Sequence, residues 1–195
     1  MKLSTLKIYV PLLIMSVTLC GCASLKGTYF VNDALSAEEH NNLGVIYEKE
    51  GKYELALREY KSASYIDDSL ITPIVNTGNI YFTLGQYTNA EKYYKKALFK
   101  DEKNLEAANN LASLYIETGV DYEEGLAYMN TATENMSLIP PYALDTMGVL
   151  YMRQGNREKA KELLLSACEN AGDDEKLLKE IASHINDMKE GLICR

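Results

Sequence analysis

Small and hydrophobic residues recur along the middle of the chain with a period of about 34 positions. A five-residue pattern, with a small residue second and tyrosine fifth, occurs four times, beginning at Leu43, Thr77, Leu111 and Met147. The small residues at its second position are spaced 34, 34 and 36 positions apart. Four copies of one unit indicate a repeat protein, in which each unit buries its hydrophobic face against its neighbours.

Each unit is predicted to hold two helices that are separated at a glycine. The glycines stand four positions after each tyrosine, at Gly51, Gly85, Gly119 and Gly155. Glycine ends a helix readily because it adopts a left-handed conformation without steric hindrance. Small residues then return twice, seven positions apart, at Ala56 and Ala63, Ala90 and Ala97, Gly125 and Ala132, and Ala160 and Ala167. We expect them to line the inner face of the second helix.

Local signals place the helix boundaries. Ser36 and Glu39 form a capping box, and Pro73 and Pro141 stand in the first turn of their helices. The first helices are therefore predicted at residues 37–50, 72–84, 105–118 and 141–154, and the second helices at 53–66, 87–100, 122–135 and 157–170. The third unit is irregular because Asp121 inserts one residue into its turn.

The repeated positions resemble the tetratricopeptide repeat (TPR) in several spaced places at once. The resemblance implies an all-α fold, a right-handed superhelical solenoid of about four TPR helix-turn-helix repeats at residues 37–70, 71–104, 105–140 and 141–174. Residues 175–195 follow them, with apolar side chains at helical spacing between Leu177 and Met188. We expect a C-terminal capping helix and tail there, covering the last repeat.

The N-terminus has the pattern of an export signal. Two lysines precede an apolar run from Ile8 to Leu19, which is shorter than the roughly 20 apolar residues that span a bilayer. The residues that follow, ending at Cys22, resemble a bacterial lipobox. This resemblance implies a lipoprotein signal peptide over residues 1–21, lipidation of Cys22, and a tether over residues 22–36. An ordinary secretory peptide or an uncleaved anchor is the alternative.

The residue after the lipidated cysteine bears on location. In Gram-negative lipoproteins an aspartate there is the usual signal for retention in the inner membrane, and this chain has Ala23. For a Gram-negative host, the resemblance therefore implies a protein of the cell envelope, anchored through its lipid to the outer membrane and facing the periplasm. Several acyl chains together give stable anchoring.

The charge of the chain restricts its partners. The formal net charge is −8, and without the two lysines of the first 21 residues 18 basic residues face 28 acidic ones, a net charge of −10. Such a body repels phosphate backbones and anionic lipid surfaces. We therefore expect no nucleic-acid partner, and we expect membrane contact only through the N-terminal lipid anchor.

The TPR resemblance also assigns a candidate binding face. In this family the first helix of each repeat lines the concave surface, and its sixth position here holds Asn42, Asn76 and Asn110. An asparagine amide both donates and accepts hydrogen bonds, so a row of them suits the backbone of an extended peptide. The alternative is that these side chains bond only to neighbouring helices. Around the row the predicted groove contains Asn41, Asn79, Asn109, Phe82 and Tyr142.

One TPR subclass does not fit the groove. Chaperone adaptors of this fold grip acidic chain termini with a clamp of lysines, asparagines and arginine. At the corresponding positions only Asn76 matches, and Glu106 has the opposite charge. An acidic C-terminus is therefore not the expected ligand.

The remaining candidate chemistry is sparse. Cys168 and Cys194 are either joined by a disulfide, which an oxidising compartment favours, or are separate thiols. His40 and His184 lie far apart in the sequence without the spacing of metal ligands, and we expect His40 to be an exposed helix residue. No catalytic or cofactor motif is present. We expect no metal, no cofactor and no enzymatic activity.

These features together predict a protein that binds other envelope proteins through the concave TPR face. The combination of lipobox and repeats is similar to type IV pilus biogenesis lipoproteins, which help a secretin ring assemble, although those usually have about six repeats. A second hypothesis is an adaptor that brings envelope hydrolases or proteases to their substrates, and a third is a subunit associated with an envelope enzyme. The sequence does not determine the oligomeric state.

Overall fold

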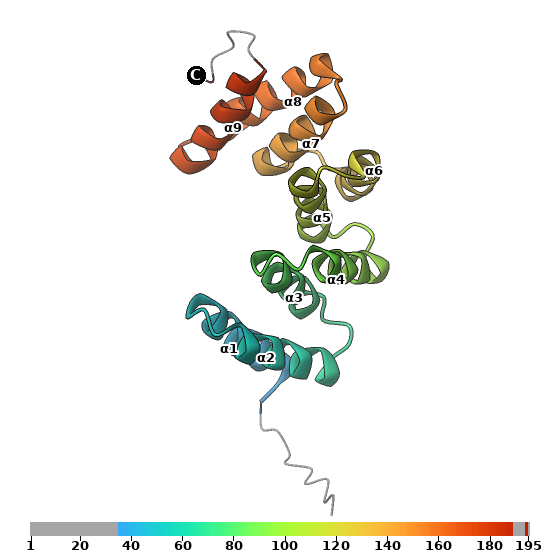
Figure 1. Ribbon diagram of the computed structural model, residues 1–195, viewed down its shortest axis with the longest axis vertical. Coiled ribbons are helices and arrows are strands. Elements are labelled where there is room, and N and C mark those ends of the chain that lie inside the picture. The colour runs from blue at the N-terminus through green and yellow to red at the C-terminus, as the bar shows by residue number, and fades with distance from the viewer. Residues whose placement is uncertain (1–34, 189–193, 195) are drawn as a thin grey trace, which may run out of the picture. The chain divides into compact units, whose positions relative to one another are not determined.

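The computed structural model describes residues 35–188 and residue 194. The signal peptide, the lipidation site Cys22 and nearly all of the tether lie outside the described residues. Residues from Ala34 onward form a compact unit by themselves. The described residues form helices and no strand, and the helices are α1 (Ala37–Lys49), α2 (Tyr53–Ile66), α3 (Thr72–Thr83), α4 (Tyr87–Lys100), α5 (Leu105–Thr118), α6 (Tyr122–Thr133), α7 (Pro141–Arg153), α8 (Arg157–Asn170) and α9 (Glu175–Asp187) (Figure 1).

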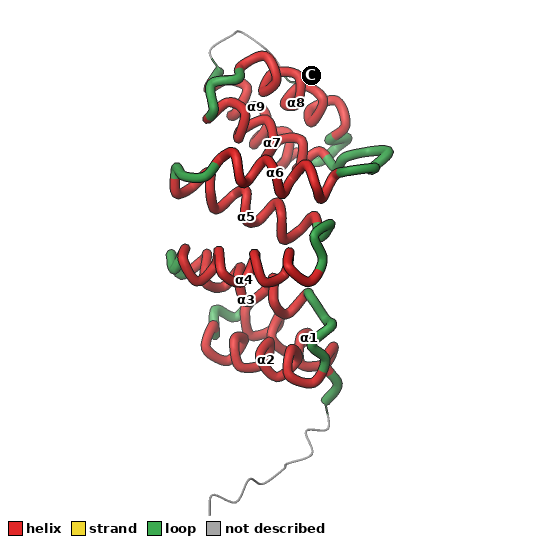
Figure 2. The backbone as a smooth tube through the Cα atoms, turned by 90° about the vertical axis from the view of Figure 1, so that its right-hand side faces the viewer, coloured by secondary structure: helices red, strands yellow, loops and turns green. Residues whose placement is uncertain are grey.

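The helices pack as four successive pairs with α9 at the end. Each odd-numbered helix from α1 to α7 contacts the helix that follows it, and it also contacts the next odd-numbered helix. The last helix, α9, packs against α8 and α7. The pairs follow one another along the unit in Figures 1 and 2. In Figure 1, α4 lies to the right of α3 and α6 lies to the right of α5. The predicted all-α repeat architecture is confirmed.

The predicted helix boundaries agree with the structure to within two residues. The largest difference is at α6, which ends at Thr133 rather than at residue 135. Glu134 already has an extended backbone, and Asn135 has a left-handed conformation with φ of 66°. The inserted Asp121 is also left-handed, with φ of 51°, so the extra residue is accommodated within the turn and the helix after it stays in register.

Close approach of the paired helices depends on the small residue of the repeated pattern. A methyl group added to Gly78 would lie 2.5 Å from a ring carbon of Tyr94 in the partner helix. Gly44 is covered in the same way by the ring of Tyr60. Both tyrosines are buried, as are the predicted inner-face alanines of the second helices. A tyrosine ring lying flat on a glycine therefore sets the distance between helices in the first two repeats.

The prediction that His40 is exposed is wrong. Its side chain is buried between α1 and α2, and its Nδ1 lies 2.8 Å from Oε2 of Glu59, which is also buried. The sequence separation of 19 residues between the two hides this pairing, because only the return of α2 along α1 brings Glu59 next to His40. A polar pair therefore occupies part of the interior of the first repeat.

Three interactions attach the C-terminal helix to the last repeat. Nδ1 of His184 in α9 lies 2.8 Å from a carboxylate oxygen of Asp145 in α7. The guanidinium of Arg157 donates to the carbonyl of Met188. A disulfide joins Cys168 in α8 to Cys194, with their Cα atoms 5.7 Å apart. These attachments hold α9 on the end of the array, where Ile181 and Ile185 are buried.

Candidate protein-interaction groove

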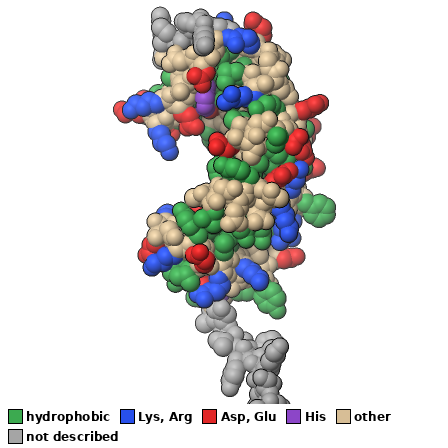
Figure 3. Space-filling model, in the orientation of Figure 1, with side chains coloured by type: hydrophobic (Ala, Val, Ile, Leu, Met, Phe, Trp, Pro, Cys, Tyr) green, Lys and Arg blue, Asp and Glu red, His purple; other side chains and the backbone are tan. Residues whose placement is uncertain are grey.

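The first helices of the four repeats, α1, α3, α5 and α7, provide the candidate binding face. Figure 3 shows the molecule hollowed on the left, the side on which α3 and α5 lie relative to α4 and α6 in Figure 1. Hydrophobic and uncharged polar side chains form most of the middle of this hollow. A surface of this kind, concave and with a few polar groups, is typical of a site that binds another molecule.

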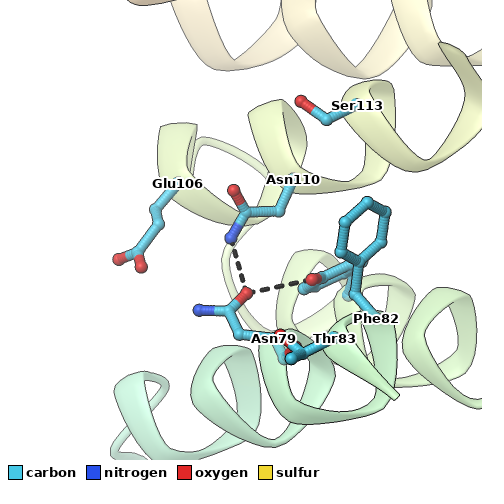
Figure 4. A pocket seen from close by; sticks show the side chains of 7 residues that line it. Asn79, Phe82, Thr83, Glu106, Asn110 and Ser113 are labelled. Carbon is cyan, nitrogen blue, oxygen red and sulfur yellow. Dashed lines mark hydrogen bonds between the residues drawn. The ribbon is translucent and has the colours of Figure 1, made fainter. Parts of the chain in front are cut away.

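A cavity of about 290 Å³ lies between α3 and α5 in this face (Figure 4). It is lined by Asn79, Phe82, Thr83, Tyr94, Glu106, Asn110 and Ser113. A second cavity of about 430 Å³ lies between α1 and α3, and Thr83 and Asn76 are among its lining residues. Thr83 lines both cavities, so they are neighbours on this face, and together they make up the groove along α1, α3 and α5.

Two of the three predicted asparagines connect successive repeats. The amide of Asn110 donates to Oδ1 of Asn79 at 2.8 Å, and the amide of Asn76 donates to Oδ1 of Asn41 at 3.1 Å. Each bond joins the first helix of one repeat to the first helix of the next. The third asparagine of the row, Asn42, is exposed. The row therefore stabilises the stacking of the repeats as well as lining the groove.

The bonded asparagines still have groups to offer a ligand. An asparagine amide has two N–H donors and an acceptor oxygen, and Asn110 makes one side-chain hydrogen bond within the described residues. Its second N–H and its oxygen are available at the cavity, next to the hydroxyl of Ser113 and the ring of Phe82 (Figure 4). The site can pair with a polar backbone and also contact one apolar side chain.

The cavity between α3 and α5 is negative in character, whereas the cavity between α1 and α3 is lined by one acid, Glu48, and one base, Lys49. Glu106 lines the first of these cavities, and neither α3 nor α5 contains a lysine or an arginine. Burial, followed by the charge of Glu106, raises the pKa of Tyr94 above its ordinary value. The same two causes raise the pKa of Tyr142. A cationic group on a ligand would therefore be favoured in this part of the groove.

The other residues predicted for the groove differ in their accessibility. Tyr142 is 42% exposed on α7. Asn109 is less accessible to a ligand than its repeat position predicted, because its Oδ1 is buried. This oxygen has no hydrogen-bond partner among the described residues. The sequence analysis did not include Tyr94, which comes from a second helix and reaches the cavity beside Asn79. Its repeat position gave no signal of this role, whereas Ser113 stands at the same repeat position as Asn79.

Two further properties describe the part of the chain that the structure covers. Within residues 35–188 no group of three or more histidine, cysteine, aspartate or glutamate side chains is arranged to hold a metal ion. None of the helices described is long and apolar enough to cross a membrane.

Comparison with known proteins agrees with the repeat geometry. Residues 38–69, 74–98 and 142–174 match the family model of the tetratricopeptide repeat. The described helices have the TPR fold. The matched stretches leave out the third TPR unit, which contains the inserted Asp121 and the early end of α6. Its helices nevertheless pack like those of the other TPR units.

Solved structures show the same fold. A tetratricopeptide repeat protein from Parabacteroides merdae has a TM-score of 0.66 at 23% identity, over 80% of this chain and 60% of that chain. MamA from Desulfovibrio magneticus, solved from residue 41 to its end, has a TM-score of 0.61 at 19% identity, over 78% of this chain and 87% of that chain. A search of curated proteins gives no significant match. At these identities the likeness of the TPR structures concerns the fold alone.

Proposed function

We propose that this protein is a membrane-anchored interaction scaffold of the bacterial cell envelope, which holds an extended segment of a partner protein in its TPR groove. The observation that carries the proposal is the cavity between α3 and α5, where hydrogen-bonding groups of Asn110 and Ser113 lie next to the ring of Phe82. Such a mixture suits a peptide whose backbone is polar and whose side chains are partly apolar.

Binding rather than catalysis is the proposed role because of the chemistry that this groove offers. The polar groups of the cavity between α3 and α5 are amides, hydroxyls and one exposed carboxylate, and it is lined by no histidine, cysteine or lysine. The cavity between α1 and α3 adds one carboxylate, Glu48, and one lysine, Lys49. A nucleophile with an adjacent base, or a pair of carboxylates facing each other, is what acyl transfer or glycoside hydrolysis requires. The groove lining provides neither arrangement.

The proposed anchor is the lipidated Cys22, on the strength of the lipobox-like residues before it. Residues 23–35 would tether the repeats within at most about 45 Å of the membrane surface. Assembly of a pilus secretin is one proposed pathway for such a scaffold, and recruitment of envelope hydrolases or proteases is the other. Deletion distinguishes them, because loss of secretin multimers is expected in the first case and altered cell-wall turnover with intact secretin in the second.

The groove is tested by crosslinked pull-down from envelopes. The informative variant is Ser113→Tyr, which adds a ring to the cavity while leaving the Asn79–Asn110 hydrogen bond in place. The matched control is Asn130→Tyr, which adds the same ring at an exposed position of α6. We expect one partner to be enriched by the wild type and the control and lost from Ser113→Tyr. Retention of that partner by the blocked variant would exclude the groove as the recognition surface.

A further inference from the structure

The outer helix α4 differs in charge from the rest of this acidic chain. It contains Lys92, Lys95, Lys96 and Lys100 but a single acid, Glu91, whereas the whole chain has a net charge of −8. Lysine and arginine side chains gather at the right-hand edge of Figure 3, at the height of α4. This helix lies on the side of the molecule opposite the groove.

Two of these lysines form ion pairs with residues outside α4. Nζ of Lys100 lies 3.6 Å from a carboxylate oxygen of Asp68, in the loop after α2. Nζ of Lys95 lies 2.8 Å from Glu91 and 3.0 Å from Glu124 in α6, so it joins α4 to the next repeat. Lys96, one position further, turns to the other side of α4 and lines a cavity of about 620 Å³ between α4 and α2. The basic character of α4 is therefore not explained by its own internal ion pairs.

The cavity between α2 and α4 combines positive charge with aromatic surface. Arg58, Lys61 and Lys96 line it against one acid, Glu54. The rings of Tyr81 and Tyr93, which also line it, are stacked with their centroids 5.4 Å apart. Cationic side chains around aromatic rings favour a ligand that is both negatively charged and partly apolar.

Exposed apolar surface continues at the C-terminal end of α4. Phe99 is 92% exposed and lines a second cavity of about 560 Å³, together with Lys100 and Tyr128. Tyr65, which is 89% exposed, occupies the same repeat position on α2, 34 residues earlier. Exposed aromatic side chains are the anchors that protein interfaces use most often.

The other repeats show that the fold does not require these side chains. At the repeat positions of Arg58 and Lys92 the third and fourth repeats have Ala127 and Glu162. At the positions of Tyr65 and Phe99 both later repeats have glutamate, Glu134 and Glu169. At these two repeat positions the cations and the exposed aromatics occur only in the first two repeats, although all four repeats pack in the same way.

We propose that the outer α2–α4 surface, comprising Arg58, Lys61, Lys96 and Phe99, binds an acidic and partly apolar segment of a second partner protein. Charge complementarity defines this partner, because an acidic segment would be repelled by most of the chain and attracted here. The cavity between α3 and α5, in which Glu106 is the only charged lining residue, and this positive surface lie on opposite sides of the helix pairs. The scaffold can therefore hold two partners of opposite charge at once.

The test is a binding titration with a defined probe, which does not depend on the lipid anchor or on the groove. The protein is the chain from Ala23 onward, which includes the compact unit that starts at Ala34. The probe is a fluorescent twelve-residue peptide in which glutamate alternates with phenylalanine and leucine. Fluorescence polarisation is measured for the wild type and for the triple variant Arg58→Gln, Lys61→Gln, Lys96→Gln, and separately for Phe99→Ser.

The matched control is Arg153→Gln, Lys176→Gln, Lys179→Gln, which removes three exposed cations from α7 and α9. We expect the outer-surface triple variant to bind at least about tenfold more weakly, which corresponds to about 1.4 kcal/mol, while the control binds like the wild type. Phe99→Ser is expected to weaken binding without changing its salt dependence. Circular dichroism of each variant verifies that the helices are retained.

Three results would overturn the proposal. The first is an absence of binding by the wild type, and the second is an equal loss in the control, which would mean unspecific attraction. The third is binding to vesicles of phosphatidylglycerol that is stronger than binding of the peptide and is lost in the outer-surface triple variant, since the surface would then recognise a membrane. Blocking the groove with Ser113→Tyr leaves this titration unchanged if the two surfaces are independent, so failure of the groove proposal and failure of this one are distinguishable.

Discussion

Oδ1 of Asn79 accepts a hydrogen bond from the amide of Asn110, 2.8 Å away, and so joins the first helices of the second and third repeats. The same oxygen accepts a second hydrogen bond, at 2.9 Å, from the hydroxyl of Tyr94 in α4. One side chain therefore links three helices at the bottom of the groove. The residue that shapes the binding face is also a residue on which the stacking of the repeats depends.

We expect Asn79→Ala to destabilise the protein, because it removes both hydrogen bonds and leaves the Tyr94 hydroxyl without its acceptor. The loss should be about 1–3 kcal/mol in the free energy of unfolding. Chemical denaturation followed by circular dichroism measures it. Asn42→Ala is the matched control, since it makes the same replacement on α1 at an exposed position and gains the same helix propensity. Equal stability of the two variants would contradict the linking role.

The contact between Gly78 and Tyr94 yields a second prediction. Gly78→Ala is expected to destabilise the fold by about 1–3 kcal/mol, because the new methyl group would collide with the ring of Tyr94. The third repeat suggests a compensating substitution, Tyr94→Met. It has Ala112 at the position of Gly78 and the buried Met129 at the position of Tyr94.

A double-mutant cycle tests whether Tyr94→Met compensates for Gly78→Ala. Gly78→Ala should cost much less in a Tyr94→Met background than in the wild type, so the coupling between the two substitutions is favourable. The four free energies of unfolding come from denaturant titrations. Additive effects of the two substitutions would show that the ring of Tyr94 does not limit the approach of α3 and α4.

The repeat period made the helices predictable from sequence. Because four copies share their small residues, glycines and alanines, one alignment located every helix pair, and the inner-face alanines Ala56, Ala90 and Ala160 are buried as expected. The period could not show which residues of a repeat contact one another, even where both of them recur. Tyr60 and Tyr94 cover glycines sixteen positions earlier, a partnership that the repeated pattern alone does not show.

The positions of the groove asparagines could be predicted from the sequence, but their hydrogen-bond partners could not. The sequence placed Asn76 and Asn110 on the face that carries the two cavities, yet it could not show in which direction their amides point. That direction depends on the stacking of neighbouring helices, which sets the distance to Asn41 and Asn79. His40 illustrates the same limit, because its burial depends on Glu59 in the facing helix.

The buried pair of His40 and Glu59 predicts an asymmetric mutational response. Either single replacement by leucine leaves the other polar side chain buried beside an apolar one, which typically destabilises a protein by about 1–3 kcal/mol. Replacing both by leucine removes the polar groups together, and we expect the double variant to be more stable than either single variant. Thermal unfolding of the three variants measures the order. A double variant less stable than both single variants would contradict this explanation.

The ion pair between His184 and Asp145 predicts a pH dependence. The hydrogen bond that the His184 ring donates to Asp145, more than the charges of Asp145, Glu180 and Asp187, raises the pKa of His184 above its ordinary value. Because the histidine binds its proton more tightly in the folded state, the pair contributes its full stability below the unfolded pKa of about 6.5. That contribution is lost as the pH rises through the higher folded pKa.

The measurement compares the wild type with His184→Gln from pH 5.5 to pH 8.5. The stability difference between the two proteins should be largest at acidic pH and shrink as the pH rises above about 6.5. Asp145→Asn should remove most of this dependence, because its amide cannot favour the protonated imidazole as a carboxylate does. A difference that stays constant across this range would show that the pair contributes without titrating.

The disulfide between Cys168 and Cys194 predicts that the attachment of α9 depends on redox conditions. The two cysteines are separated by 26 positions, and the loop that they close contains all of α9. A crosslink over a loop of this length stabilises a fold by about 3–4 kcal/mol in the chain-entropy description. Dithiothreitol should therefore lower the unfolding temperature of the wild type and leave Cys194→Ser unchanged. Hydrogen exchange should become faster first in the amides of α9, because only the contacts of His184 and Arg157 and the buried side chains of the helix would then retain it. Equal exchange of α9 in oxidised and reduced protein would mean that its packing on α7 and α8 suffices without the crosslink.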